Sequence, residues 1–218
     1  MSDSLGATLH LELVAAVIYA IRAHAVELSE LDRAIGDGDH GDNMERGIEA
    51  LAECSFEPDS SPGEQLLVIG RLIMDRVGGA SGALYGACLM TMGRTLCADS
   101  SENASNWLVA FEAGIDRIGQ LGGAKPGQKT MLDVMVPAAR AWRAVTGRDS
   151  SQIIKHVSDA ASTGLEATRS MRATKGRAAY FAERSIGHLD PGAKSSELVI
   201  VAVAEWLMTQ ALRERHLA

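Results

Sequence analysis

Apolar residues recur at every third or fourth position along most of the chain, and this spacing limits the fold more than any other feature of the sequence. Near the N-terminus, Leu13, Val17 and Ile21 fall on one face of a helix in this way. The valine-rich run 198–204 has the length and flanks of a buried helix rather than a strand. The spacing predicts eight helices, over residues 7–30, 42–54, 61–77, 83–96, 107–120, 131–145, 150–171 and 195–212. We therefore expect an all-α protein with a single domain over residues 1–218.

The charge balance argues against several classes of partner. The chain has 28 acidic and 21 basic residues and a formal net charge of −7, so free nucleic acid and anionic membranes are not expected partners. Its three cysteines form no Cys-x-x-Cys pair, which argues against a disulfide framework or a zinc site. We find neither a signal peptide nor an apolar run of about 18 residues that would span a membrane. The expected location is the cytoplasm.

An acidic, glycine-rich segment follows the first predicted helix. Asp32, Asp37 and Asp39 lie within eight residues, and Gly36 and Gly38 flank the middle carboxylate. Neighbouring carboxylates repel one another unless a cation lies between them, and Mg²⁺ prefers oxygen ligands. Glycine also lets the backbone approach a ligand closely. The segment therefore predicts a Mg²⁺ site with room for phosphates, although a solvated Asp/Gly turn would have the same composition.

Two common ion- and phosphate-binding loops do not fit the sequence. An EF-hand loop that began at Asp37 would have Asp42 at its glycine position and Ile48 at its bidentate acidic position. The Walker A segment, Gly-x-x-x-x-Gly-Lys-Ser/Thr, is absent from the sequence. A nucleotide would therefore be bound by another design.

Three more irregular segments separate the later helices. Residues 78–82 are all small, a composition that fits either a tight turn between helices or a backbone cradle for phosphate. Residues 122–131 include Lys125 and Lys129, which an exposed loop would leave solvated. Residues 173–192 form a long loop, and long loops are often functional. Because alternate loops of an up-and-down helical arrangement lie at the same end, we expect these segments and the acidic segment to converge.

Four stretches in chain order resemble one family, the L subunit of dihydroxyacetone kinase (the DAK2-domain family), which also forms the C-terminal nucleotide domain of single-chain dihydroxyacetone kinases. They are Leu31-Asp32 with 35–44, the small residues 78–82, residues 124–131, and residues 175–192. Two positions depart from the family pattern: Ala83 stands where proline is usual, and Gln128 where aspartate is usual. Neither departure removes a predicted metal ligand.

The resemblance implies a closed barrel of eight antiparallel amphipathic helices with a nucleotide site at one end. It implies two Mg²⁺ ions, held by Asp32, Asp37 and Asp39, that bridge to the phosphates of ADP or ATP. Catalytic roles are implied for these three residues, His40 and Arg177, although a structural ion pair with a loop carboxylate explains Arg177 equally well. The implied nucleotide contacts are His40, Gly41, Asn43, Ala80, Ser81, Gly122, Thr130, Met131, Gly176, Arg177, Asp190, Pro191 and Gly192.

The activity that the resemblance implies is phosphoryl transfer through a tightly held nucleotide. A phosphohistidine protein, charged from phosphoenolpyruvate (PEP), would rephosphorylate bound ADP, and the ATP so formed would phosphorylate dihydroxyacetone on a partner K subunit. Two alternatives stay open: an ATP-dependent kinase subunit for another small ketose such as a tetrulose, and a nucleotide-loaded regulatory binding module. The presence of all three acidic residues argues against the second alternative. The sugar, the phosphoryl source and the oligomeric state, a homodimer included, are left open by the sequence.

Overall fold

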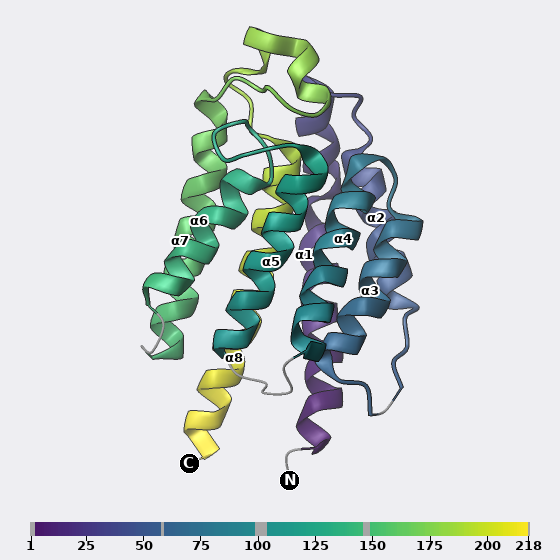
Figure 1. Ribbon diagram of the computed structural model, residues 1–218, viewed down its shortest axis with the longest axis vertical. Coiled ribbons are helices and arrows are strands. Elements are labelled where there is room, and N and C mark those ends of the chain that lie inside the picture. Colours follow the sequence, from purple (N-terminus) through teal and green to yellow (C-terminus); the bar gives the residue numbers. More distant parts are fainter. Residues whose placement is uncertain (1–2, 58, 99–103, 146–148, 218) are drawn as a thin grey trace.

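The computed structural model describes residues 3–57, 59–98, 104–145 and 149–217, and every regular element in these ranges is helical (Figure 1). The predicted all-α class is therefore confirmed. No helix in the described ranges combines the length and the apolar content that a membrane span needs. The elements are α1 (Asp3–Ile35), α2 (His40–Ala52), α3 (Pro62–Arg76), α4 (Gly79–Ala98), α5 (Ala104–Gly122), α6 (Leu132–Ala144), α7 (Ser150–Ala167), the 3₁₀ segments η1 (Thr168–Ser170) and η2 (Arg177–Ser185), and α8 (Pro191–Leu217).

The helices run side by side, and their connections alternate between two ends of the molecule (Figure 1). Each α-helix packs against the next one in sequence, and α8 packs against α1. Both chain termini lie at one end, whereas η2 and the connections 36–39, 77–78 and 123–131 lie at the other (Figure 1). The glycine-rich segments therefore converge on one end, as the alternation of loops predicts.

Some predicted boundaries were wrong by two to four residues, and two of these errors affect the candidate site. Helix α2 begins at His40 rather than near Asp42, and α4 begins at Gly79 rather than near Ala83. Ala80 and Ser81 therefore lie in the first turn of a helix and not in a loop. The predicted loop 173–192 contains η2, and α7 ends at Ala167, where η1 follows it.

Apolar clusters between neighbouring helices form the core. One cluster joins α4, α5 and α6, a second joins α6, α7 and α8, and a third joins α1, α2 and α8. The first two clusters extend to the glycine-rich end, where they include Met131 and Ala193. Their buried members include Cys88, Leu108, Ile115, Ile118, Leu132 and Met135 in the first, Val134, Ala138, Val157, Ala161 and Leu165 in the second, and Ile21, Leu28, Met44, Ile48 and Leu198 in the third.

Glycines allow α3 and α4 to approach each other closely. A Cβ on Gly70 would lie 2.8 Å from the carbonyl oxygen of Gly86, and a Cβ on Gly86 would lie 2.7 Å from that of Gly70. Two turns away, Gly63 and Gly93 face each other in the same way, at 2.9 and 2.6 Å. Backbone atoms cannot move aside as flexible side chains can, so these positions accept no side chain at this helix separation.

We expect Gly86→Ala to destabilise the protein, because the added methyl group would push α3 and α4 apart. Overpacking of this kind costs about 1–3 kcal/mol, which lowers the melting temperature by roughly 5 °C in a protein of this size. The matched control is Gly119→Ala in α5, where the nearest atom to a Cβ is 3.4 Å away. Thermal unfolding followed by circular dichroism should show a lower melting temperature for Gly86→Ala alone. Equal melting temperatures of the two variants would contradict the packing argument.

Candidate functional site

The acidic segment between α1 and α2 is ordered by its own backbone. One carboxylate oxygen of Asp32, a buried residue near the end of α1, accepts hydrogen bonds from the N–H groups of Asp39 (2.9 Å) and His40 (3.2 Å). A Cβ on Gly36 would lie 2.1 Å from the other carboxylate oxygen of Asp32, so only glycine leaves room for that side chain. Gly38 has a φ of +81°, which glycine adopts without strain. The two glycines therefore fix the turn that leads from α1 into α2.

The turn brings the three predicted metal ligands together. Oxygens of Asp32, Asp37 and Asp39 all lie within 4.8 Å of one another. Arg177, the first residue of η2, forms ion pairs with Asp37 and, at 3.2 Å, with Asp39. Arg177 therefore pairs with loop carboxylates in this structure, and its catalytic role stays a prediction. The arrangement suits a hard divalent cation, because all the donors are oxygens and the absence of a side chain at Gly36 makes space for one of them.

The electrostatics of the cluster follow from its burial and charge. Burial raises the pKa of Asp32 and the charge of Asp37 raises it further, whereas backbone hydrogen bonds from His40, Asp39 and Gly38 oppose both effects. At Asp37, desolvation acts to raise the pKa, but the hydrogen bond and the positive charge of Arg177 together outweigh it, so the pKa is lowered. A cation between the carboxylates would favour the ionised form of each.

The first turns of α2 and α4 meet beside the acidic cluster. A Cβ on Gly78 would lie 2.3 Å from the side-chain oxygen of Asn43, and a Cβ on Gly79 would lie 3.7 Å from its side-chain nitrogen. The same Cβ on Gly79 would lie 3.9 Å from a guanidinium nitrogen of Arg177. Asn43 is also held by Arg46, whose guanidinium donates a hydrogen bond to its side-chain oxygen. Two helix N-termini, whose free N–H groups attract anions, therefore face the same region.

His40 links these two first turns through its side chain. Its Nδ1 lies 3.2 Å from Ser81 Oγ in α4, and its Nε2 lies 2.9 Å from Ser195 Oγ in α8. Burial lowers the pKa of His40 to about 4, although the negative charge of Asp39 acts in the opposite direction. The imidazole is therefore neutral near pH 7 and acts as a hydrogen-bonding group between two hydroxyls. Its catalytic role stays a prediction.

Lys129 is not solvated, in contrast to the exposed-loop interpretation of residues 122–131. It is only 1% exposed, and its ammonium group donates hydrogen bonds to the carbonyl oxygens of Thr168, at 2.6 Å, and of His188. Its φ of +60° is unusual for a residue with a side chain. Lys125, by contrast, is exposed. Lys129 therefore joins the α5–α6 connection to the α7–α8 connection, a role that the sequence did not reveal.

Asp133 was also missed by the sequence analysis. Its buried carboxylate accepts hydrogen bonds from the N–H groups of Thr130, at 2.8 Å, and of Gly127. Gln128, the departure from the family pattern, accepts a hydrogen bond from the N–H of Lys125 at 2.8 Å, so its side chain serves the loop itself. These contacts shape the segment that carries Thr130 and Met131.

Asp190 immediately precedes α8 and lies close to the same segment. Its buried carboxylate accepts a hydrogen bond from the N–H of Ala193 at 2.7 Å, which caps the helix. Burial raises the pKa of Asp190 to about 7, although that N–H group and the charge of Lys129 act to lower it. A Cβ on Gly192 would lie 3.2 Å from this carboxylate and 3.9 Å from Cβ of Met131.

The predicted site residues therefore fall into groups. One group surrounds the acidic cluster, and a second joins the 122–131 segment to the start of α8. Gly41 faces α1, where a Cβ would lie 2.0 Å from the carbonyl oxygen of Ala25, and Gly122 and Gly176 are exposed. The first group contains Asp32, Asp37, Asp39, His40, Asn43, Ala80, Ser81 and Arg177; the second contains Thr130, Met131, Asp190, Pro191 and Gly192.

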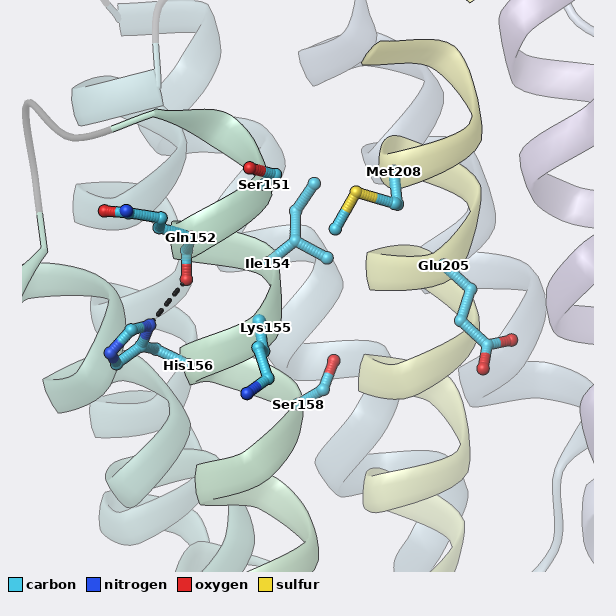
Figure 2. A pocket seen from close by; sticks show the side chains of 8 residues that line it. All are labelled: Ser151, Gln152, Ile154, Lys155, His156, Ser158, Glu205 and Met208. Atoms are coloured by element: carbon cyan, nitrogen blue, oxygen red, sulfur yellow. Dashed lines mark hydrogen bonds between the residues drawn. The ribbon is translucent and has the colours of Figure 1, made fainter. Parts of the chain in front are cut away.

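A pocket of about 620 Å³ lies elsewhere, between the start of α7 and the end of α8 (Figure 2). Ile154 and Met208 face each other across it, and Lys155 and Glu205 lie on opposite sides (Figure 2). These segments are at the end of the molecule that carries the termini (Figure 1). The pocket therefore contributes nothing to the candidate site.

Comparison with known proteins gives a family match over most of the chain. Residues 34–205 match the DAK2 domain. The ADP-binding subunit DhaL of PEP-dependent dihydroxyacetone kinase 1 from Listeria innocua is 38% identical over 179 residues, which cover 82% of this chain and 85% of that one. Human triokinase/FMN cyclase is 35% identical over 204 residues, which cover 91% of this chain but 34% of the human one.

The fold is also similar to that of a solved kinase. The crystal structure of the dihydroxyacetone kinase of C. freundii matches with a TM-score of 0.72 and 25% identity, over 88% of this chain and 33% of that chain. The same kinase has been solved in complex with AMP-PNP and Mg²⁺, and that structure shares the fold with a TM-score of 0.71. The chain thus spans most of the bacterial subunit and about a third of the longer proteins.

We expect Lys129→Met to destabilise the protein by about 2–4 kcal/mol, because it leaves two carbonyl groups without their donor and removes the positive charge beside Asp190. Lys125→Met, in the same loop but exposed, should change stability by less than about 0.5 kcal/mol. Urea unfolding of both variants and the wild type measures the difference. Equal stability of the two variants would show that the buried ammonium group does not hold the loops together.

The raised pKa of Asp190 predicts a pH dependence of stability. Between about pH 4 and pH 7 the folded state keeps a proton that the unfolded state has lost, so this carboxyl lowers the free energy of unfolding as pH rises. The upper bound is about 4 kcal/mol over that range. His40, whose pKa is lowered, acts in the opposite direction, but it is present in both proteins when Asp190→Asn is compared with the wild type. Urea unfolding at about pH 5 and pH 8 should show the variant gaining stability relative to the wild type at the higher pH. A pH-independent difference would contradict the assignment.

Proposed function

The chain belongs to the DAK2 domain family, and from that premise we propose that it is the nucleotide-binding subunit of a dihydroxyacetone kinase that works with ADP or ATP and Mg²⁺. The observation that carries the proposal is the convergence of three carboxylates beside the first turns of α2 and α4. The name of the L. innocua relative, an ADP-binding subunit of a PEP-dependent dihydroxyacetone kinase, supports this assignment.

Asp32, Asp37 and Asp39 would hold the metal, as two ions in this proposal. When bound, Mg²⁺ would neutralise charge on the phosphates and help to align the attacking and leaving oxygens, which is most of what phosphoryl transfer requires. The carboxylates themselves would fix the metal relative to α1 and α2. Arg177 would lose its present pairing with Asp37 as cations enter, which would leave its guanidinium available to the transferring phosphoryl group.

The helix N-termini would bind the phosphates. Backbone N–H groups in the first turns of α2 and α4 and the hydroxyl of Ser81 are donors that suit phosphate oxygens. The segment that ends at Thr130 and Met131 would border the base and ribose, and the start of α8 would complete the wall. The full set of proposed contacts is His40, Gly41, Asn43, Ala80, Ser81, Gly122, Thr130, Met131, Gly176, Arg177, Asp190, Pro191 and Gly192.

The proposed partners follow from the same assignment. A K subunit would hold the ketose, and a phosphohistidine protein charged from PEP would rephosphorylate bound ADP. The names of the L. innocua relative and of its E. coli counterpart, which is 39% identical over 77% of this chain, both describe PEP-dependent kinases. In this scheme the chain positions and recycles the nucleotide, and the partner determines which sugar is phosphorylated.

We expect Asp37→Asn to weaken the binding of ADP in the presence of Mg²⁺ by at least about tenfold, because a neutral amide replaces a charged metal ligand. The fold should persist within about 1 kcal/mol, because the side chain of Asp37 is 47% exposed and packs little. Calorimetric titration with ADP and Mg²⁺ measures the affinity, and phosphoryl transfer to a ketose in the presence of a K subunit should be lost.

The matched control is Asp42→Asn, an exposed carboxylate in the first turn of α2 that lies outside the cluster. It should bind ADP and Mg²⁺ as the wild type does. Wild-type protein that binds no ADP, and carries none on purification by mass spectrometry, would refute the proposed function. Unchanged Mg²⁺-dependent binding by Asp37→Asn would refute the metal ligands alone.

A further inference from the structure

The segment from the start of η1 to the end of η2 is rich in positive charge. Residues 168–185 contain five basic side chains and a single acidic one, Glu183. Four of the basic side chains have partners among the described residues: Arg169 pairs with Glu166, Arg172 with Glu183, Arg177 with the acidic cluster, and Arg184 with the Phe181 ring. The fifth belongs to Lys175, which forms no ion pair or hydrogen bond with any side chain in the described ranges.

The ammonium group of Lys175 lies beside a glycine of the α5–α6 connection. A Cβ on Gly123 would lie 3.7 Å from Nζ of Lys175. The neighbouring Gly122 is close to α4, because a Cβ on it would lie 3.8 Å from Cδ2 of Leu84, which follows Ser81 by three residues. Both glycines are exposed, and Lys175 itself is half-buried. The positive charge therefore lies at the surface, close to the part of α4 where the phosphates of a nucleotide are proposed to bind.

The stretch that carries Lys175 also reaches the other side of the candidate site. The N–H of Thr174 donates a hydrogen bond to the carbonyl oxygen of Gln128 at 3.4 Å, which joins the stretch to the 122–131 segment. Three residues later, the guanidinium of Arg177 pairs with the acidic cluster. All these segments lie at the end of the molecule opposite the termini (Figure 1). Lys175 and Arg177 therefore place two positive charges along the path from the 122–131 segment to the predicted metal ligands.

These two cations differ in what they contact. Carboxylates neutralise Arg177, whereas a half-buried ammonium group that lacks a partner favours the binding of an anion. We propose that Lys175 binds the diphosphate of the nucleotide from the side of the 122–131 segment, while Arg177 and the acidic cluster face it from the other side. The inference rests on the proposed function, because it takes the anion to be a nucleotide phosphate, and it adds a binding residue to that site.

Lys125 is the matched control for Lys175. It lies at the same end of the molecule, carries the same charge, and its side chain forms no ion pair or hydrogen bond within the part of the chain that the structure describes. It differs from Lys175 in being exposed. A general effect of positive charge on nucleotide affinity would be the same for both lysines, whereas direct contact with the phosphates would be specific to Lys175.

The first measurement is calorimetric titration with ADP and Mg²⁺. Lys175→Met should lower the affinity by about tenfold or more, the usual size for a hydrogen bond to a charged group, and Lys125→Met should change it by less than about twofold. Lys175→Arg, which keeps the positive charge, should recover most of the affinity. The affinity of Lys175→Met should also depend less steeply on salt concentration than that of the wild type, because one contact between charges is lost.

The second measurement separates nucleotide binding from a structural role of Lys175. The urea midpoint of nucleotide-free Lys175→Met should equal that of the wild type, because the ammonium group has no partner to lose among the described residues. Added ADP and Mg²⁺ should raise the midpoint of the variant less than that of the wild type, because stabilisation by a ligand follows its affinity for the folded state.

The outcomes separate this inference from the proposed function. Equal ADP affinity of Lys175→Met and Lys125→Met would overturn the inference and leave the function intact. A lower urea midpoint of nucleotide-free Lys175→Met would overturn it as well, because the lysine would then stabilise the fold itself. Absence of ADP binding by the wild-type protein would refute the function first and the inference with it.

Discussion

Electrostatic repulsion among Asp32, Asp37 and Asp39 is the constraint that the whole glycine-rich end of the molecule must satisfy. Their oxygens lie within 4.8 Å of one another, a separation at which like charges raise the free energy unless something positive is close. Backbone N–H groups offset the charge of Asp32. Arg177, which follows Asp39 by 138 positions in the chain, offsets the charges of Asp37 and Asp39. The acidic segment thus determines where the last long connection comes to lie, and a cation that enters the cluster must compete with the arginine.

Polar contacts add to the apolar packing that holds the connections at this end. The apolar cluster there is small, with Ile35, Ala173 and Ala178 as its buried members. Lys129 instead spans two connections with a buried ammonium group, which is stable only because carbonyl oxygens and the nearby Asp190 surround it. Removing one partner of such a group leaves the others without a hydrogen-bond or ion-pair partner. The loss of a single contact would therefore destabilise both connections. This arrangement keeps the loops in fixed positions while leaving space beside them for a charged ligand.

Local sequence signals were enough to predict the helices, the acidic segment and the convergence of the loops, because each prediction depends on the spacing of residues along the chain. They were not enough for Lys129, whose burial depends on carbonyl groups near residues 168 and 188. Asp133 had a weak signal, since an acidic residue three positions after Thr130 can bind the N–H groups that start a helix. Ser195 had none, because a serine in a helix reads as an ordinary surface residue until its neighbours from α2 and α4 are known.

The small residues 78–82 were open to two interpretations, a helix-to-helix turn or a phosphate cradle, and the structure shows why these are not alternatives. A Cβ on Gly82 would lie 2.1 Å from the carbonyl oxygen of Val77, and one on Gly78 would strike Asn43 at 2.3 Å. Glycine is therefore required for the turn to fold tightly and to press against the first turn of α2. That close approach is also what sets Ser81 beside His40 and puts two helix N-termini next to the carboxylates. An anion at this point would meet free N–H groups and a hydroxyl because the turn is tight, so the packing requirement and the binding requirement select the same residues.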